Sequence, residues 1–197
     1  VYPYEPGGTP GSHSGPGTGG LTTKMYWDYW EFTRDPEVLS RVVYPTLHSM
    51  SRFLTRTVRD YGGAYLASFS ASPEQMLNGR YTRGGAYYHT VGCAFDQQML
   101  YENGKDTLAG AELLGEADET TAILAAQVDN YSPIAIGWSG QIKEYLEENY
   151  YGEIGEYNHR HISQLVALMP GTLITSSTPA TQPGATTLRP ARLKSIT

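Results

Sequence analysis

Residues 39–58, LSRVVYPTLHSMSRFLTRTV, contain the clearest helical pattern of the chain. Apolar side chains recur at intervals of three and four residues, at Leu39, Val42, Val43, Leu47, Met50, Phe53, Leu54 and Val58. This spacing places them on one face of a helix that packs against other elements. Pro45 cannot supply an amide hydrogen to a helical bond, so we expect a break near Tyr44-Pro45 and a longer helix from there to about Asp60.

Outward from this stretch, similar patterns predict further helices joined by short connections. Residues 21–32 form the helix before it, and Asp35-Pro36 between the two supplies a cap and a first-turn proline. The helices predicted after it cover residues 96–103, 107–114, 118–128, 140–149 and 161–168. Residues 61–92 read as irregular, and strand signals are few. The predicted fold class is therefore all-α.

The two ends of the chain differ from the rest in composition. Residues 1–20 are rich in glycine and proline, and they read either as a disordered leader or as a long loop packed across a larger domain. Residues 171–197 lack periodicity and read as unstructured. All acidic residues lie at or before Glu156, so the end of the chain is basic. We expect a folded region over residues 21–175 and a disordered or aberrant tail over residues 176–197.

Composition and charge exclude several classes of protein. A single cysteine, Cys93, excludes internal disulfides and cysteine-based zinc clusters. A net charge of −6 argues against nucleic-acid binding, and no apolar run has the length of a membrane span. Sixteen tyrosines and three tryptophans suit sugar surfaces, but they suit other amphipathic interfaces as well. The chain begins at Val1, without an initiator methionine or a signal-like segment, and we expect residues to precede it.

Residues 68–74, SFSASPE, place the acid Glu74 behind a proline in a serine-rich loop. A carboxyl group held in such a loop can be partly desolvated, which raises its pKa and suits it to donate a proton. On local sequence alone, an ordinary capping or surface glutamate is the favoured interpretation of Glu74.

A second polar group, His159-Arg160-His161, offers several hydrogen-bond donors within a short segment, enough to hold sugar hydroxyls. A metal site is the rival interpretation. Metal-binding histidines in a helix prefer spacings of three or four residues, and these two stand two apart, with no cysteine or suitable acid beside them. We therefore expect no metal here, while a structural role for the pair stays open.

Taken together, these segments resemble glycoside hydrolase family 95, the inverting α-L-fucosidases and α-L-galactosidases. The matching segments follow the family's order over about 150 residues. They are 27–35 (WDYWEFTRD), Tyr44-Pro45, 62–66 (GGAYL), Ser72-Pro73-Glu74, 95–98 (FDQQ), 140–145 (GQIKEY), 159–163 (HRHIS) and Pro170-Gly171. Each match alone is weak, but their common order makes the resemblance specific.

The resemblance implies a fold, a reaction and a set of site residues. The family's catalytic domain is an (α/α)6 barrel, of which residues 21–175 would supply about half of the helices. Glu74 matches the general acid, and His159, Arg160 and His161 match the segment that lines the sugar subsite. The implied partner is a fucosylated or galactosylated oligosaccharide or glycan. No cofactor or metal is implied, and secretion is the family's habit.

Other parts of the family's apparatus have no match in this sequence. The family's base is an aspartate in a downstream Asp-Gly-Asn-Phe-Gly segment, and its supporting asparagine pair lies upstream of the region that matches Leu21. Within the matched region, Gln75 replaces an asparagine and Gln164 replaces a histidine. We therefore expect the chain alone to be inactive. A non-catalytic carbohydrate-binding relative and an all-α interaction module remain the alternatives.

Overall fold

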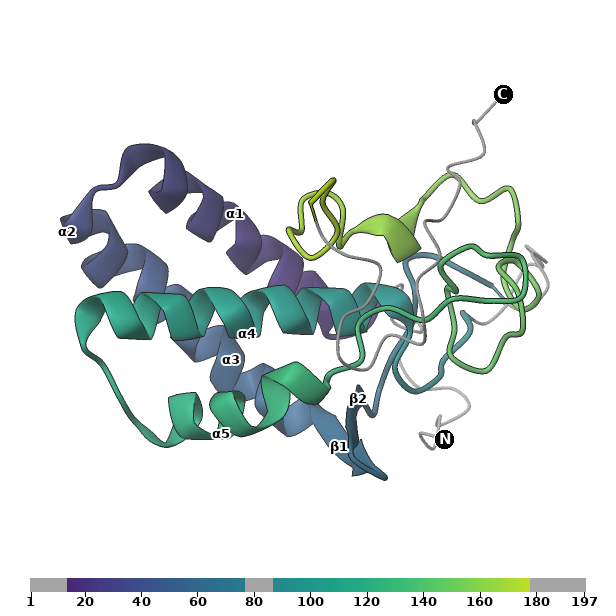
Figure 1. The fold of residues 1–197 in the computed structure, drawn as a ribbon, viewed down its shortest axis with the longest axis horizontal. Coiled ribbons are helices and arrows are strands. Elements are labelled where there is room, and N and C mark those ends of the chain that lie inside the picture. The colour runs from purple at the N-terminus through teal and green to yellow at the C-terminus, as the bar shows by residue number, and fades with distance from the viewer. Residues whose placement is uncertain (1–13, 77–86, 178–197) are drawn as a thin grey trace.

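The computed structural model describes residues 14–76 and 87–177. Most regular elements in this part of the chain are helices, and the remaining one is a sheet of two antiparallel strands. Helices α1, α3, α4 and α5 run side by side, while irregular segments gather at the end of the molecule where α1 and α4 begin (Figure 1). The all-α prediction is thus right for most of the regular structure and wrong for the small sheet.

Helix α1, Gly17–Thr33, begins inside the segment predicted to be a loop. The start of α1 lies very close to α4 and leaves no room for a side chain, so glycine is required there. A Cβ atom on Gly17 would come within 2.8 Å of the Cα atom of Asp96. On Gly20 it would meet the carbonyl oxygen of Met99. The expectation of a loop up to residue 20 is therefore wrong from Gly17 onward, and residues 1–13 lie outside the described residues.

The helical path through Pro45 continues without a break. Asp35 caps α2, Pro36–Val38, which passes into a π-helical turn, Leu39–Val43, and then into α3, Tyr44–Thr57. The amide of Tyr44 donates to the carbonyl of Leu39, five residues back, and this wider turn accommodates the proline at the start of α3. The prediction of a break is therefore corrected to a π-helical turn, and α3 ends at Thr57 rather than near Asp60.

A β-hairpin follows α3, in a region predicted to be helical and then irregular. Strand β1, Val58–Tyr61, pairs with β2, Ala64–Ala67, and Val58 lies opposite Ala67. Gly62 and Gly63 form the two-residue turn with φ angles of 73° and 99°, which side chains disfavour and glycine adopts freely. The hairpin leads the chain directly into the loop that contains Glu74.

Helix α4, Ala94–Leu114, is one continuous helix of 21 residues where two were predicted. The polar residues in its middle suggest a loop between two helices, but their side chains point into the molecule and have polar partners there. The Asn103 side chain accepts from Ser51 Oγ (2.7 Å) and donates to Thr23 Oγ1 (2.9 Å). Lys24 Nζ lies 3.3 Å from Asp106 Oδ2. These partners satisfy the buried polar groups, so the helix runs on.

Helix α5, Glu119–Gln127, and the short 3₁₀ turn Val128–Asn130 confirm the predicted helix over residues 118–128. Asp118 and Thr121 form a capping box at its start. In contrast, residues 140–149 form turns instead of the predicted helix, because Glu148 Oε1 accepts from the amides of Glu144 (2.5 Å) and Tyr145 (3.3 Å). The helix predicted over residues 161–168 is reduced to a 3₁₀ turn, Ser163–Leu165.

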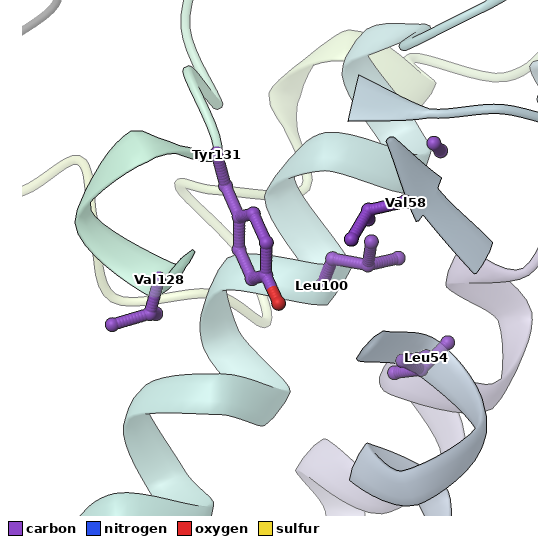
Figure 2. Close-up of a cluster of buried hydrophobic side chains, with 6 residues drawn as sticks. Leu54, Val58, Leu100, Val128 and Tyr131 are labelled. Carbon is purple, nitrogen blue, oxygen red and sulfur yellow. The ribbon is translucent and has the colours of Figure 1, made fainter. Parts of the chain in front are cut away.

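Buried apolar side chains connect the helices with the irregular end. In one cluster, Leu54 of α3, Val58 of β1 and Leu100 of α4 meet Val128 and Tyr131, which follow α5 (Figure 2). Another cluster joins α1 to α3 around Trp27, Trp30 and Leu47.

The beginning of the predicted tail is also packed. Leu173 is buried, and the amides of Thr172 and Leu173 donate to Glu102 Oε1 at 2.7 and 3.0 Å. Order therefore extends beyond residue 171, where the unstructured region was expected to begin. Residues 178–197 lie outside the described residues, so the expectation of a disordered tail remains a prediction there.

Candidate active site

Glu74 lies in a tight turn formed by Ser72, Pro73, Glu74 and Gln75. The amide of Gln75 donates to the carbonyl of Ser72 at 2.9 Å, which closes the turn. Proline suits the second position of such a turn because its φ angle is already fixed there. Glu74 occupies the third position, and its side chain is 32% exposed, so the carboxylate is partly shielded but still reachable from solvent.

A buried carboxylate at the start of α4 anchors the chain before this turn. Asp96 Oδ2 accepts from Ser70 Oγ (2.6 Å) and from the amide of Ala71 (3.2 Å). Asp96 Oδ1 accepts from the amide of Gly17 at 2.7 Å, which ties the first turn of α1 to the same point. Burial raises the pKa of Asp96 to about 6, although its hydrogen bonds oppose the shift.

A second buried carboxylate, Glu144, contacts the turn itself. Its Oε1 accepts from Ser72 Oγ and its Oε2 accepts from Gln75 Nε2 (3.3 Å). Burial, supported by the nearby charge of Glu148, raises the pKa of Glu144 to about 7, against the opposing effect of the Ser72 bond. Glu144 thus binds the first and the last residue of the turn that carries the candidate acid.

The segment that follows His159 brings a cation and an imidazole to the Glu74 carboxylate. Arg160 forms an ion pair with Glu74 Oε2, and His161 Nε2 lies 3.4 Å from the same oxygen, although the histidine is 87 residues away in the sequence. Two of the three predicted binding residues are therefore brought directly to the predicted acid.

His159 is placed differently from its two neighbours. The residue is 9% exposed, and its Nδ1 accepts from the backbone amide of His161 at 3.1 Å. Burial lowers the pKa of His159, and the neighbouring His161 adds to the shift while Glu156 opposes it. His159 therefore lies behind the segment, where it orients the backbone of His161, and its Nε2 has no hydrogen-bond partner within the described residues.

The segment is fastened to the acid turn and to α4 by side-chain bonds to backbone groups. Ser163 Oγ donates to the carbonyl of Pro73 at 3.1 Å. The Gln98 amide group donates to the carbonyl of Gln164 (2.9 Å) and accepts from the amide of Ala167 (2.8 Å). These bonds supply partners that helical bonds would otherwise have supplied, which explains why the predicted helix over residues 161–168 is so short.

A cavity of about 560 Å³ opens beside this group. Glu74, Arg160 and His161 form part of its lining, together with Ser14, Thr18 and Ser163. Its apolar lining consists of Leu21, Pro73, Phe95, Ile162, Leu165, Val166, Leu168 and Met169. A somewhat larger cavity of about 650 Å³ lies between α1 and α3, and neither a carboxylate nor a histidine lines it. The smaller cavity therefore combines space for a ligand with groups able to exchange protons and bind hydroxyls.

Within residues 14–76 and 87–177, no cluster of three or more histidine, cysteine or acidic side chains has the arrangement of a metal site. Over the same residues, no helix has the length and apolar character needed to cross a membrane.

Comparison with known families matches the description "Glycosyl hydrolase family 95 catalytic domain" over residues 3–197. The chain belongs to this family. It is 29% identical over 152 residues to Alpha-L-fucosidase 2 of Arabidopsis thaliana, an alignment that covers 76% of this chain and 17% of that protein. It is 36% identical over 93 residues to Probable alpha-fucosidase A of Aspergillus oryzae, which covers 44% of this chain and 12% of that protein.

A third relative, Probable alpha-fucosidase A of Aspergillus niger, is 27% identical over 169 residues, covering 82% of this chain and 20% of that protein. The chain thus spans a fifth or less of the length of these relatives. The family resemblance inferred from the ordered motifs is confirmed. The positions of Asp96, Gln98 and Glu144 add what the motifs lacked: these residues lie in matched segments, and they hold the candidate site together.

Proposed function

We propose that this chain is part of the catalytic domain of a glycoside hydrolase that removes terminal α-L-fucosyl, or α-L-galactosyl, residues from an oligosaccharide or glycan. The observation that carries the proposal is the meeting of Glu74 with Arg160 and His161 at one cavity in a chain of family 95. The names of the relatives, which are alpha-fucosidases, favour a fucoside as the substrate.

In this proposal Glu74 is the general acid. It protonates the glycosidic oxygen as the bond to the anomeric carbon breaks, while a base activates water on the opposite face of the sugar, so that the configuration inverts. The base is an aspartate outside residues 1–197. We further propose that the helices are about half of an (α/α)6 barrel, whose remaining half carries that base. The chain alone should then show no hydrolysis.

Arg160 and His161 are proposed to bind the sugar. Both side chains line the cavity and contact the same oxygen of Glu74. A guanidinium and an imidazole can donate to sugar hydroxyls or to the ring oxygen, and a bound sugar can take these donors from the carboxylate. We assign His159 to the same subsite through His161, because His159 accepts a hydrogen bond from the backbone amide of His161.

The test is Glu74→Gln in the full-length protein that contains this chain. With fucosyl-α-1,2-galactose as substrate, the turnover number should fall by about 10²- to 10⁴-fold, the usual contribution of a positioned general acid. Binding of the disaccharide should be largely retained, because glutamine keeps the shape of the side chain. Turnover by the variant at the rate of the unmodified enzyme would remove Glu74 from the acid role.

The same measurements separate hydrolysis from binding alone. Binding of the disaccharide with no hydrolysis by the unmodified full-length protein would identify it as a non-catalytic carbohydrate-binding relative. Membership of family 95 speaks against an unrelated all-α interaction module. A robust rate from the purified 197-residue chain would contradict the proposed location of the base.

A further inference from the structure

The turn that carries Glu74 is held at both ends by one buried carboxylate. Ser72 begins the turn and Gln75 ends it, and the side chains of both donate to Glu144, one to each carboxylate oxygen. Glu144 is 2% exposed, so water does not compete for these bonds. Because the backbone bond from Gln75 to Ser72 closes the same four residues, the orientation of Glu74 between them is strongly constrained.

Gln75 extends this connection to the segment that contains Arg160. Its Nε2 donates to Glu144, and its Oε1 accepts from the amide of Glu156 at 2.8 Å. The carbonyl of Glu156 in turn accepts from the amide of His159 at 3.3 Å. Gln75 is fully buried, and both polar atoms of its side chain are paired: the nitrogen binds an acceptor and the oxygen binds a donor. The acid turn and the cationic segment therefore share one fixed point at Glu144.

We propose that Glu144 is a positioning residue that sets the orientation of Glu74 by binding Ser72 and Gln75. This inference rests on the proposed function, because it assigns Glu144 a role only through the acid. A carboxylate suits the position because it accepts at both oxygens. A glutamine of the same shape keeps only one acceptor oxygen, so its NH₂ group must face either Gln75 Nε2, which can only donate, or Ser72 Oγ, whose hydroxyl would have to turn and accept.

Stability alone gives little reason to keep a carboxylate at this place. Removing a carboxylate from water is unfavourable, and even a buried ion pair can often be replaced by apolar residues with a gain in stability. The nearby charge of Glu148 is of the same sign and raises the pKa of Glu144 further. Such an arrangement fits a group retained for the geometry that it imposes on its neighbours.

The experiment uses Glu144→Gln in the full-length protein and two substrates that differ in leaving group. Fucosyl-α-1,2-galactose has a poor leaving group that needs protonation by the acid, whereas 4-nitrophenyl α-L-fucoside has a good one that does not. A displaced acid should lower the turnover number for the disaccharide by about 10- to 100-fold with little change in KM. The loss for the aryl fucoside should be much smaller.

Glu147→Gln is the matched control, since it makes the same change three residues away. Glu147 is exposed and accepts from the hydroxyls of Tyr88 and Thr90, and within the described residues it forms no hydrogen bond or ion pair with the acid turn. It should leave both rates unchanged. If Glu144→Gln instead loosened the fold in general, the turnover numbers for both substrates would fall equally. That result, or no loss for either substrate, would overturn the inference.

Two further variants complete the test. Glu74→Gln must itself spare the aryl fucoside more than the disaccharide; if it does not, the proposed function fails and this inference fails with it. If Glu74→Gln shows the selective loss and Glu144→Gln does not, the positioning role alone is wrong. Should Glu144→Gln fail to fold, Ser72→Ala removes one of its two donors, and absence of the selective loss in that variant would overturn the inference.

Discussion

Helices α1 and α3 contact each other and α4 through apolar side chains and through polar side chains that bind one another, as Asn103 binds Ser51 and Thr23. In the loops that form the candidate site, polar side chains of α4 bind backbone groups instead. Trp27, Trp30 and Leu47 belong to the first kind of contact. Asp96 and Gln98 belong to the second, and both bind backbone groups of distant segments. Side chains of one helix thus perform different tasks: those toward α1 and α3 pack against other side chains, and some of those toward the loops fix irregular backbone by hydrogen bonds.

This difference has a consequence for how the two regions respond to change. Apolar packing is distributed over many contacts, so losing one side chain lowers the stability of the whole domain. A hydrogen bond from a buried side chain to a loop amide is local and directional, so its loss should first release that loop.

The largest effect is expected from Leu100→Ala in α4. Leu100 is 1% exposed and packs in the cluster that joins α3, the hairpin and the segment after α5 (Figure 2). Its truncation should lower the free energy of unfolding by about 2–5 kcal/mol. Leu113→Ala on the same helix, where the side chain is 57% exposed, is the control and should change it far less. Equal losses in thermal or urea unfolding would contradict the distinction between packed and exposed faces of α4.

Asp96→Asn should come next, because Asp96 joins the two regions. It accepts from Gly17 of α1 as well as from Ser70 and Ala71 of the site loop. In an asparagine, an NH₂ group replaces one of the two accepting oxygens, so at least one of these donors loses its acceptor. The free energy of unfolding should fall by about 1–3 kcal/mol. Glu37→Gln, which neutralises an exposed carboxylate paired with Arg41, should have an effect below about 0.5 kcal/mol. Comparable losses for the two variants would show that burial of Asp96 is unimportant.

The same residue gives a dependence on pH with a defined sign. Burial raises the pKa of Asp96 from 3.8 to about 6, so the folded state binds this proton more tightly than the unfolded state does. The stability linked to that proton is fully present below about pH 4 and is lost as the pH rises to about 6. The melting temperature of the unmodified chain should fall over this interval, and the fall should be smaller in Asp96→Asn.

The regions also differ in how far the sequence predicts them. Periodic apolar residues and the Asp118 cap suffice for the helix that ends near Val128, since these signals act within a few residues. Residues 140–149 carry a similar pattern and yet form turns, because Glu144 and Glu148 are committed to other partners. Ordered motifs identified the family and brought Glu74 and Arg160 to attention. No local signal indicates which distant backbone groups Gln98 would bind.

The smallest effect on global stability, and the most selective one, is expected from Gln98→Leu. Leucine keeps much of the side-chain volume, so packing around α4 should survive. The carbonyl of Gln164 and the amide of Ala167 lose their partner, and the segment can recover by opening toward water. Hydrogen exchange at Ala167 should therefore speed up by about 10-fold or more, while amides in the middle of α4 keep their protection. If exchange rose equally in both places, the loops would be stabilised by the same cooperative packing as the helices, and the two kinds of contact would not be separable.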